Sequence, residues 1–269
     1  MIELFDTHSH IIPNLDDGPD SESETLAMLE LYKINRVTKI ICTPHIFPGL
    51  YNNDRSSILE GVNRLKELIS EHKLNIEVFP GSEVMAYFNL EKDVNTDKIL
   101  TINDQNRFLF IEFPLAGVMP NFFEDLLFKI QIGGLTPVLS HPERYSFIIK
   151  TPSKIYSMVN RDICIQINSG SILGRFGKEV QKTADFLIRH RLFHLIGTDA
   201  HSVNSRPPDL MEAYKKISEY LTKEETEIIF KKNPEALVSN QGLFMLEPVP
   251  IDKSRKRFFG FLKKIFKPE

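Results

Sequence analysis

Short apolar segments with the composition of β-strands alternate along this chain with longer segments of helical periodicity. This order is typical of parallel strands joined by crossover helices. Seven strands are predicted, at residues 2–5, 39–42, 76–79, 108–113, 136–139, 164–167 and 194–196. Helices are predicted between and after them, at residues 21–35, 55–72, 121–132, 153–160, 177–191, 210–221 and 223–232. The pattern predicts an α/β fold whose strand number is close to that of a barrel.

The length and the local composition indicate one large domain and a short tail. The chain has 269 residues, a size that α/β barrels reach as a single unit. Residues 253–267 contain seven Lys or Arg residues and no acid. We therefore predict a barrel over residues 1–250 and a separate basic tail over residues 251–269. On a helical wheel the apolar side chains of the tail gather on one side and its later lysines on the other, which predicts an amphipathic helix.

Charge and cysteine content exclude several classes of protein. The formal net charge of −3 provides no basic field for nucleic acid, so we expect no nucleic-acid partner. Without a leader signal or an apolar stretch long enough to span a bilayer, the expected location is the cytoplasm. Cys42 and Cys164 lie in apolar segments and are predicted to be buried thiols. The residues six positions later are Pro48 and Gly170 rather than Arg, which excludes a cysteine-dependent phosphatase.

Histidines and carboxylates follow six of the seven predicted strands. In a barrel of parallel strands these positions share one face, where active sites are found. His8 and His10 also lie two residues apart on an extended segment, so their side chains point the same way and can chelate one ion. Any one such residue is more often an ordinary loop residue, but their joint placement favours a site. The candidate ligands are His8, His10, Asp17, His45, Glu83, Glu112, His141, Asp199 and His201.

The ligand types narrow the choice of metal. Imidazole and carboxylate ligands without thiolate suit Mn, Fe or Zn, and nine of them are enough for two or three ions. The remaining histidines, His72, His190 and His194, are explained by charge complementation at helix ends or by surface exposure, and we assign them no chemistry.

Five motifs carry a resemblance to a known superfamily. They are Thr7-His8-Ser9-His10, Asp16-Asp17-Gly18-Pro19, Ser140-His141-Pro142-Glu143-Arg144-Tyr145, Gly197-Thr198-Asp199-Ala200-His201 and Ser205-Arg206-Pro207-Pro208. In this order they resemble the polymerase-and-histidinol-phosphatase superfamily, and within it the bacterial capsule-associated tyrosine phosphatases of the CpsB/CapC/YwqE type, over about residues 4–240. The resemblance implies a distorted seven-stranded TIM-like (β/α)7 barrel with a centre of three metals, often assigned as Mn.

The resemblance also implies roles for individual residues. All nine candidate ligands match the family's ligands in type, and the two arginines near phosphate fall on Arg144 and Arg206. We regard Glu83 as the candidate bridging ligand, and Asp199 or His201 as residues that could assist proton transfer. The segment from His45 to Tyr51 lacks the basic residues that some relatives carry there, so substrate docking could differ.

The implied activity is protein-tyrosine phosphatase activity on the phosphotyrosine tail of a membrane-associated bacterial tyrosine kinase that controls capsular or exopolysaccharide synthesis. One alternative is a phosphoesterase of the same superfamily that acts on a small metabolite such as histidinol phosphate. Another is a noncatalytic scaffold that binds the kinase tail. We also expect weak membrane-surface contact through residues 253–267, peripheral at the inner face of the membrane, although the tail could instead bind an acidic partner or pack on the barrel.

Overall fold

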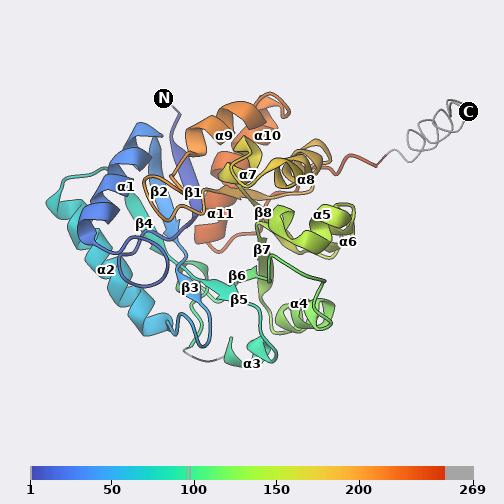
Figure 1. Cartoon of the computed structure of the whole chain (residues 1–269), viewed down its shortest axis with the longest axis horizontal. Helices are drawn as coiled ribbons and strands as arrows, with labels where there is room; N and C mark the ends of the chain where they lie inside the picture. Colours follow the sequence, from blue (N-terminus) through green and yellow to red (C-terminus); the bar gives the residue numbers. More distant parts are fainter. Residues whose placement is uncertain (1, 95, 97, 252–269) are drawn as a thin grey trace, which may run out of the picture.

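The computed structural model describes residues 2–94, 96 and 98–251, and it shows a ring of parallel strands surrounded by helices (Figure 1). The strands are β1 (Leu4–Ser9), β2 (Val37–Cys42), β3 (His45–Ile46), β4 (Glu77–Pro80), β5 (Glu83–Met85), β6 (Phe108–Glu112), β7 (Thr136–Ser140), β8 (Cys164–Asn168) and β9 (Leu195–Gly197). They pair in the orders β1-β2-β4 and β3-β5-β6-β7-β8-β9, and every pair is parallel. The α/β class is confirmed.

The nine strands correspond to the seven that the sequence predicts. Cys42 pairs with Pro80 and His45 pairs with Glu83, so the register between the two chain segments does not change. β3 therefore continues β2, and β5 continues β4, across short breaks. Proline at position 44 has no amide hydrogen to donate to a neighbouring strand, which accounts for one of these breaks.

The first and last strands lie together without a regular ladder in the described part of the chain. Ser9 and Ala200 form one isolated parallel bridge. The amide of His10 donates to the carbonyl oxygen of Ala200 at 2.9 Å, and the amide of Asp199 donates to that of His8 at 2.8 Å. This local seam accounts for the distorted, TIM-like character of the barrel.

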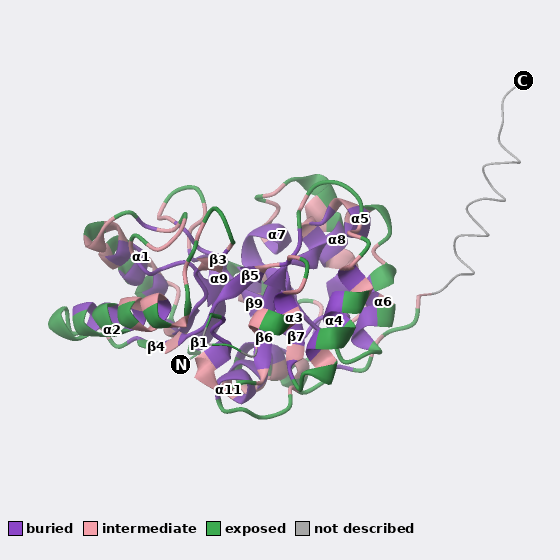
Figure 2. Ribbon diagram, turned by 90° about the horizontal axis from the view of Figure 1, so that it is seen from below, coloured by how far each residue is buried: buried purple, intermediate pink, exposed green. Residues whose placement is uncertain are grey.

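Helices cover the outside of the strands, and the longer ones, such as α1 and α2, have buried and exposed residues along their length (Figure 2). They are α1 (Glu22–Ile34), α2 (Arg55–Glu71), α3 (Leu90–Asp93), α4 (Phe123–Ile132), α5 (Ser146–Lys150), α6 (Lys154–Val159), α7 (Ser169–Leu173), α8 (Lys178–Arg189), α9 (Leu210–Ile217), α10 (Lys223–Glu227) and α11 (Asn233–Val238). Local sequence fixes several starts: Ser21 caps α1, and Asp54 caps α2 in a capping box with Ser57. None of the helices in the described residues has the length and apolar character needed to cross a bilayer.

Several predicted boundaries were wrong. The first strand is Leu4–Ser9 rather than 2–5, because its polar residues are satisfied by distant partners, such as Thr7 donating to the carbonyl oxygen of Ile196 at 2.9 Å. The helix predicted at 210–221 ends at Ile217. The bounds of the helix predicted at 223–232 are confirmed, although its second half, Ile228–Lys232, is π-helical. The short helices α5 and α7 were not predicted, because five residues are too few to show periodicity. The predicted tail lies outside the described residues, apart from Ile251.

The interior of the barrel is apolar along most of its strands and polar at their carboxyl ends. Phe108 and Phe110 belong to an inner cluster with Phe5 and Leu195, and Glu112 follows at the next position of the same alternation. The ring of Phe110 meets the ring of His8 edge to face at 5.5 Å between centroids. The apolar interior therefore forms the floor on which the polar residues at the strand ends rest.

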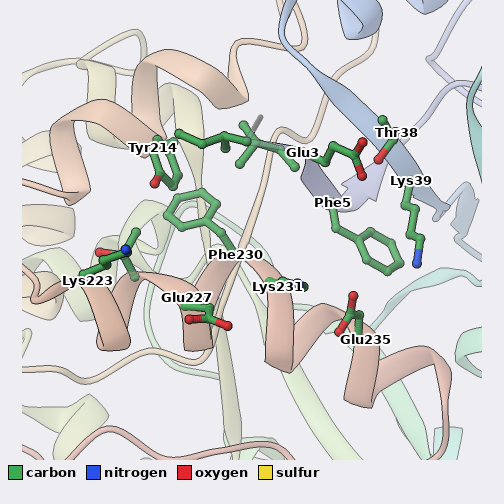
Figure 3. A pocket seen from close by; sticks show the side chains of 13 residues that line it. Glu3, Phe5, Thr38, Lys39, Tyr214, Lys223, Glu227, Phe230, Lys231 and Glu235 are labelled. Carbon is green, nitrogen blue, oxygen red and sulfur yellow. The ribbon is translucent and has the colours of Figure 1, made fainter.

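A cavity of about 330 Å³ lies where β1 and β2 begin, at the opposite end of the strands (Figure 3). Phe5, Tyr214 and Phe230 contribute apolar walls, and charged residues of both signs surround them, with Lys39 lying 5.8 Å from the centroid of the Phe5 ring. None of the predicted site residues lines this cavity, so it is distinct from the site.

Glycine at position 197 allows the close approach of β9 to β1. A Cβ atom there would lie 2.4 Å from the Cβ of His8 and 3.0 Å from its amide nitrogen. We expect Gly197→Ala to lower the free energy of unfolding by at least about 1–3 kcal/mol, because the strands must separate. Gly242→Ala is the control, since its nearest atom would lie at an ordinary 3.6 Å. Urea unfolding midpoints that are equal for the two variants would contradict this reading.

Candidate metal centre

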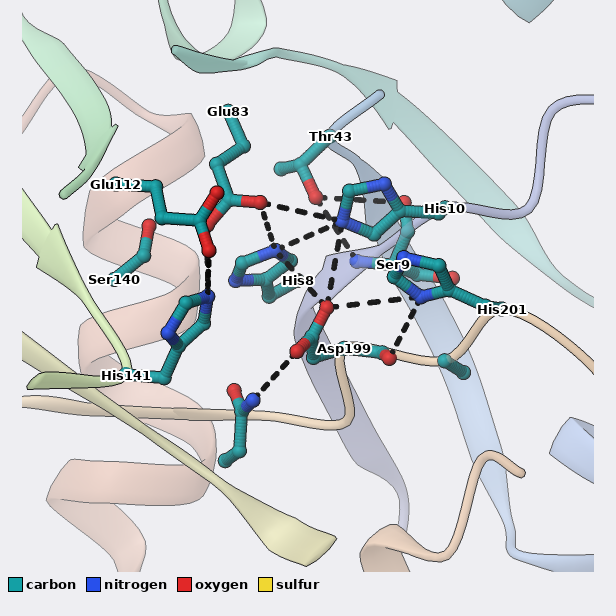
Figure 4. Close-up of polar contacts among 12 residues, drawn as sticks. His8, Ser9, His10, Thr43, Glu83, Glu112, Ser140, His141, Asp199 and His201 are labelled. Atoms are coloured by element: carbon teal, nitrogen blue, oxygen red, sulfur yellow. Dashed lines mark hydrogen bonds and ion pairs between the residues drawn. The ribbon is translucent and has the colours of Figure 1, made fainter. Parts of the chain in front are cut away.

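The predicted ligands lie near the carboxyl ends of β1, β2, β4, β6, β7 and β9. Figure 4 shows His8, His10, Glu83, Glu112, His141, Asp199 and His201 facing one another. Eight of them fall into three overlapping groups whose ligand atoms lie within 4.8 Å of one another. The groups are His10, Asp17, His45 and His201; His8, His10, Glu83 and Asp199; and His45, Glu83 and Glu112. The ninth, His141, places its Nε2 3.0 Å from Glu83 Oε1 and 3.6 Å from Glu112 Oε1. Shared members join the three groups into one cluster.

Glu83 lies at the centre of this cluster. Its Oε2 is 3.4 Å from His8 Nε2, 3.5 Å from His10 Nε2 and 3.3 Å from His45 Nδ1, while its Oε1 faces His141. The carboxylate is fully buried. A carboxylate whose two oxygens face different sets of imidazoles has the arrangement needed to bridge two cations.

Unsatisfied atoms in the cluster fit a bound cation. Within the described residues, Glu83 Oε2, Asp199 Oδ1, His45 Nδ1 and His201 Nε2 are buried and make no hydrogen bond. Buried polar atoms are normally paired, and an unmade bond costs about 1–3 kcal/mol. These atoms are all imidazole nitrogens or carboxylate oxygens, which are ligands of Mn, Fe and Zn. The residues present therefore fit a metal centre.

The charges of the site also favour a cation. Burial, together with the neighbouring Glu83 and Asp199, raises the pKa of Glu112 well above its usual value, because three carboxylates share a small volume. Burial lowers the pKa of His141 and of His201 to about 4. These two imidazoles are neutral at neutral pH, the form that binds metal.

Arg144 and Arg206 both reach the cluster through Asp199. Arg144 Nη1 lies 2.9 Å from Asp199 Oδ2, and Arg206 pairs with the same oxygen. Burial acts to raise the pKa of Asp199, but Arg206, followed by His8 and His201, holds it well below its usual value. The guanidinium of Arg144 also stacks on the ring of Phe176 at 4.3 Å. Neither arginine is a surface ion-pair partner, since their side chains are 15% and 23% exposed.

Asp16 is a site residue that the sequence did not identify. Its Oδ2 lies 2.6 Å from His10 Nδ1 and accepts the amide hydrogen of His45 at 2.8 Å. A carboxylate on the far nitrogen of an imidazole fixes its tautomer and leaves Nε2 available for metal. The sequence analysis chose Asp17 from the adjacent pair Asp16 and Asp17. Their positions in the sequence do not show which carboxylate would bind metal and which would hydrogen-bond to a ligand.

The side-chain amides of Gln166 and Asn168 on β8 form hydrogen bonds with members of the cluster. Gln166 Oε1 lies 3.0 Å from His8 Nδ1 and accepts the amide hydrogen of His141 at 3.2 Å. Gln166 Nε2 donates to Asn168 Oδ1, and Asn168 Nδ2 donates to Asp199 Oδ2 at 2.6 Å. The sequence analysis predicted no site residue on β8, because it looked for histidines and carboxylates and these two residues are neutral amides.

The three histidines without predicted chemistry lie away from the cluster. His72 and His190 follow the last residues of α2 and α8, as predicted. The explanation by helix ends or exposure was wrong for His194, which is 2% exposed. Its Nδ1 accepts the amide hydrogen of Ile165 at 3.0 Å, and burial lowers its pKa to about 4. Cys42 and Cys164 are buried free thiols, as predicted.

The role of Asp16 predicts a measurable effect on metal affinity. We expect Asp16→Asn to weaken divalent-metal binding about 10–100-fold, because an amide supports the His10 imidazole less well. Asp20→Asn removes an exposed acid of the same loop and should leave the affinity unchanged. Competition with a fluorescent chelator measures both, and equal affinities for the two variants would remove Asp16 from the site.

Comparisons with known proteins identify the family of this chain. Residues 4–239 match the family described as capsular polysaccharide synthesis, CpsB/CapC. The chain is 32% identical to the tyrosine-protein phosphatase YwqE of Bacillus subtilis over 258 residues, covering 96% of this chain and 100% of that one. It is 27% identical to the tyrosine-protein phosphatase CpsB of Streptococcus pneumoniae over 243 residues, covering 88% and 99%.

Solved structures of related proteins also match this chain. The crystal structures of YwqE and CpsB, metal-dependent tyrosine phosphatases, provide a match with a TM-score of 0.86 and 31% identity that covers 93% of this chain and 100% of the matched one. A histidinol phosphate phosphatase from Lactococcus lactis shares the fold, with a TM-score of 0.51 and 12% identity over 93% of this chain. The extent of the family match and of the full-length relatives places this chain in the CpsB/CapC family of capsular polysaccharide synthesis.

Proposed function

We propose that this protein is a metal-dependent protein-tyrosine phosphatase. The observation that carries the proposal is the convergence of nine imidazole and carboxylate ligands with two arginines at one end of the barrel. The relatives YwqE and CpsB, which are named tyrosine-protein phosphatases, support the substrate class. We further propose two or three Mn²⁺ ions as the cofactor, with Fe and Zn as the other metals that suit the same ligands.

The chain's own residues would perform distinct tasks in phosphotyrosine hydrolysis. Bound divalent cations supply a nucleophilic water at neutral pH and neutralise phosphoryl oxygens. Arg144 and Arg206, each with a planar guanidinium, would bind the remaining phosphoryl oxygens and stabilise the charge that develops there. Asp199 holds both arginines at the edge of the cluster, so they are oriented before substrate arrives. His201 or Asp199 is proposed to assist proton transfer.

The leaving group suits this arrangement. A tyrosine phenolate has a conjugate acid with a pKa of about 10, well below that of an alkyl alcohol, so a strong general acid is less necessary. A covalent phosphoenzyme is not required by the proposed route. Both cysteines are buried, and burial raises the pKa of Cys164 to about 12, so neither thiol is a suitable nucleophile.

The biological setting is proposed from the family. Its description as capsular polysaccharide synthesis supports a substrate in the phosphotyrosine tail of a membrane-associated tyrosine kinase. We propose a cytoplasmic protein that contacts the inner membrane face weakly through residues 253–267, which are rich in basic and apolar residues. The proposed domain division, 1–250 and 251–269, follows from the same change in composition.

Metal removal and refilling test the proposed activity. Protein stripped with chelator and refilled with Mn²⁺ should hydrolyse a phosphotyrosine peptide, and His141→Ala should lower kcat/KM by at least about a hundredfold, because it removes an imidazole from the cluster. His72→Ala, an exposed histidine at the end of α2, is the matched control and should retain activity.

Other outcomes separate the alternatives. Hydrolysis of histidinol phosphate without hydrolysis of phosphotyrosine would retain the phosphoesterase and reject the tyrosine phosphatase. Binding of a phosphotyrosine peptide with no turnover in any metal would instead indicate the noncatalytic scaffold.

A further inference from the structure

A second pocket lies beside the metal cluster, and the proposed function does not use it. Its volume is about 300 Å³, at the lower end of the range for ligand pockets. Its lining residues are Ile46, Pro48, Tyr51, Asn52, Asn53, Asp54, Tyr87, Asp93, Lys98 and Ile99. They belong to β3 and to the segments that follow β3 and β5, the two strands that carry the candidate ligands His45 and Glu83. The pocket therefore adjoins the part of the chain that presents these two ligands.

Tyr51 connects the pocket with the cluster. Its ring lies parallel to the imidazole of His45, with 10° between the planes and 5.7 Å between the centroids, while it also lines the pocket. Asn53 Nδ2 donates to the carbonyl oxygen of His45 at 2.9 Å, which fixes this loop relative to the ligand. The Tyr51 ring therefore borders both the pocket and the candidate ligand His45.

Several charged and polar groups of the pocket have partners within the protein. The Tyr87 hydroxyl donates to Asp93 Oδ2 at 2.7 Å, and Lys98 Nζ lies 2.8 Å from Asp93 Oδ1. Asp54 Oδ1 accepts the amide hydrogen of Ser57 at 2.8 Å. Since these charges and donors are satisfied within the protein, the pocket offers a ligand mainly apolar and aromatic surface.

The exposed side chains nearby have the same character. Leu50, next to Tyr51, is 60% exposed, and Phe88, next to Tyr87, is 71% exposed. Large exposed apolar residues beside a binding site often mark contact with a polypeptide. The segment from His45 to Tyr51 also lacks basic residues, so an acidic flank on the substrate gains no cation from this segment.

We propose that this pocket binds an apolar side chain one or two residues away from the phosphotyrosine of a polypeptide substrate. The proposal rests on the proposed function and adds a sequence preference to it. With the phosphoryl group at the cluster, the substrate main chain lies one tyrosine side chain away from the metals. One or two extended residues add about 3–7 Å along that main chain, so a flanking side chain can enter the pocket beyond the Tyr51 ring. A free phosphomonoester would not reach the pocket and would gain nothing from it.

A peptide panel tests the proposal directly on the full chain refilled with Mn²⁺. Each peptide carries one phosphotyrosine, with Leu, Ala or Asp placed in turn at the two positions before and the two positions after it. We expect Leu to exceed Asp in kcat/KM by about tenfold or more at one position, the gain expected for burying a leucine side chain. Equal values at every position would overturn the subsite, whatever other molecule the pocket takes.

Variants of Tyr87 assign the preference to the pocket. Tyr87→Ala should reduce the Leu preference to within about twofold, while Tyr87→Phe, which keeps the ring and loses the bond to Asp93, should retain it. Tyr156→Ala on α6 is the matched control for loss of a half-buried tyrosine ring elsewhere. All of these variants should hydrolyse free phosphotyrosine like the unaltered protein, and a preference that survives in Tyr87→Ala would overturn the assignment.

The panel also separates this inference from the function on which it rests. Failure to hydrolyse any phosphotyrosine substrate would reject the proposed function. Hydrolysis of free phosphotyrosine and of all peptides at one rate would leave the function intact and reject the subsite. If Tyr87→Ala does not fold, as judged by thermal melting, the panel on the unaltered protein still decides whether an apolar preference exists.

Discussion

The buried carboxylate of Glu83 is the group on which the rest of the site depends. It lies within 3.0–3.5 Å of four imidazoles from β1, β3 and the end of β7, at a position with no exposure to water. Burial acts to raise its pKa, but the charge of His8, together with hydrogen bonds from His10 and His141, outweighs this and holds it well below the usual value. Because a buried charge without compensation is costly, the strand ends must hold all four imidazoles in place.

The contacts between β1 and β9 help to hold the imidazoles of β1 in place around Glu83. Asp6 accepts hydrogen bonds from the amide of Thr198 at 2.8 Å and from the hydroxyl of Tyr32 at 2.7 Å, beneath the two ligand-bearing segments. Burial raises the pKa of Asp6 to about 6 despite these bonds. The seam therefore contains polar side chains where a regular barrel would have a ladder of backbone hydrogen bonds. The absence of a Cβ at Gly197 also lets β9 approach β1, which brings His8 and Asp199 close together. Stability and ligand geometry depend on the same contacts.

The sequence predicted the parallel strands and the nine side chains that cluster at their ends, because both leave local signals. Imidazoles and carboxylates after apolar strands are visible in a single sequence, and the breaks within β2–β3 and β4–β5 did not change the register. Its failures involve long-range contacts. Thr7 finds its partner 189 residues away, so the extent of β1 could not be predicted from its neighbours. Gln166 and Asn168 are neutral amides whose role appears only when β8 lies beside His8 and Asp199.

Anomalous diffraction from a crystal grown with Mn²⁺ would locate the ions independently of activity. We expect two or three Mn²⁺ peaks within ligand distance of the nine residues, with the carboxylate of Glu83 contacting two of them. A single ion that does not touch Glu83, or ions bound elsewhere on the chain, would contradict this expectation.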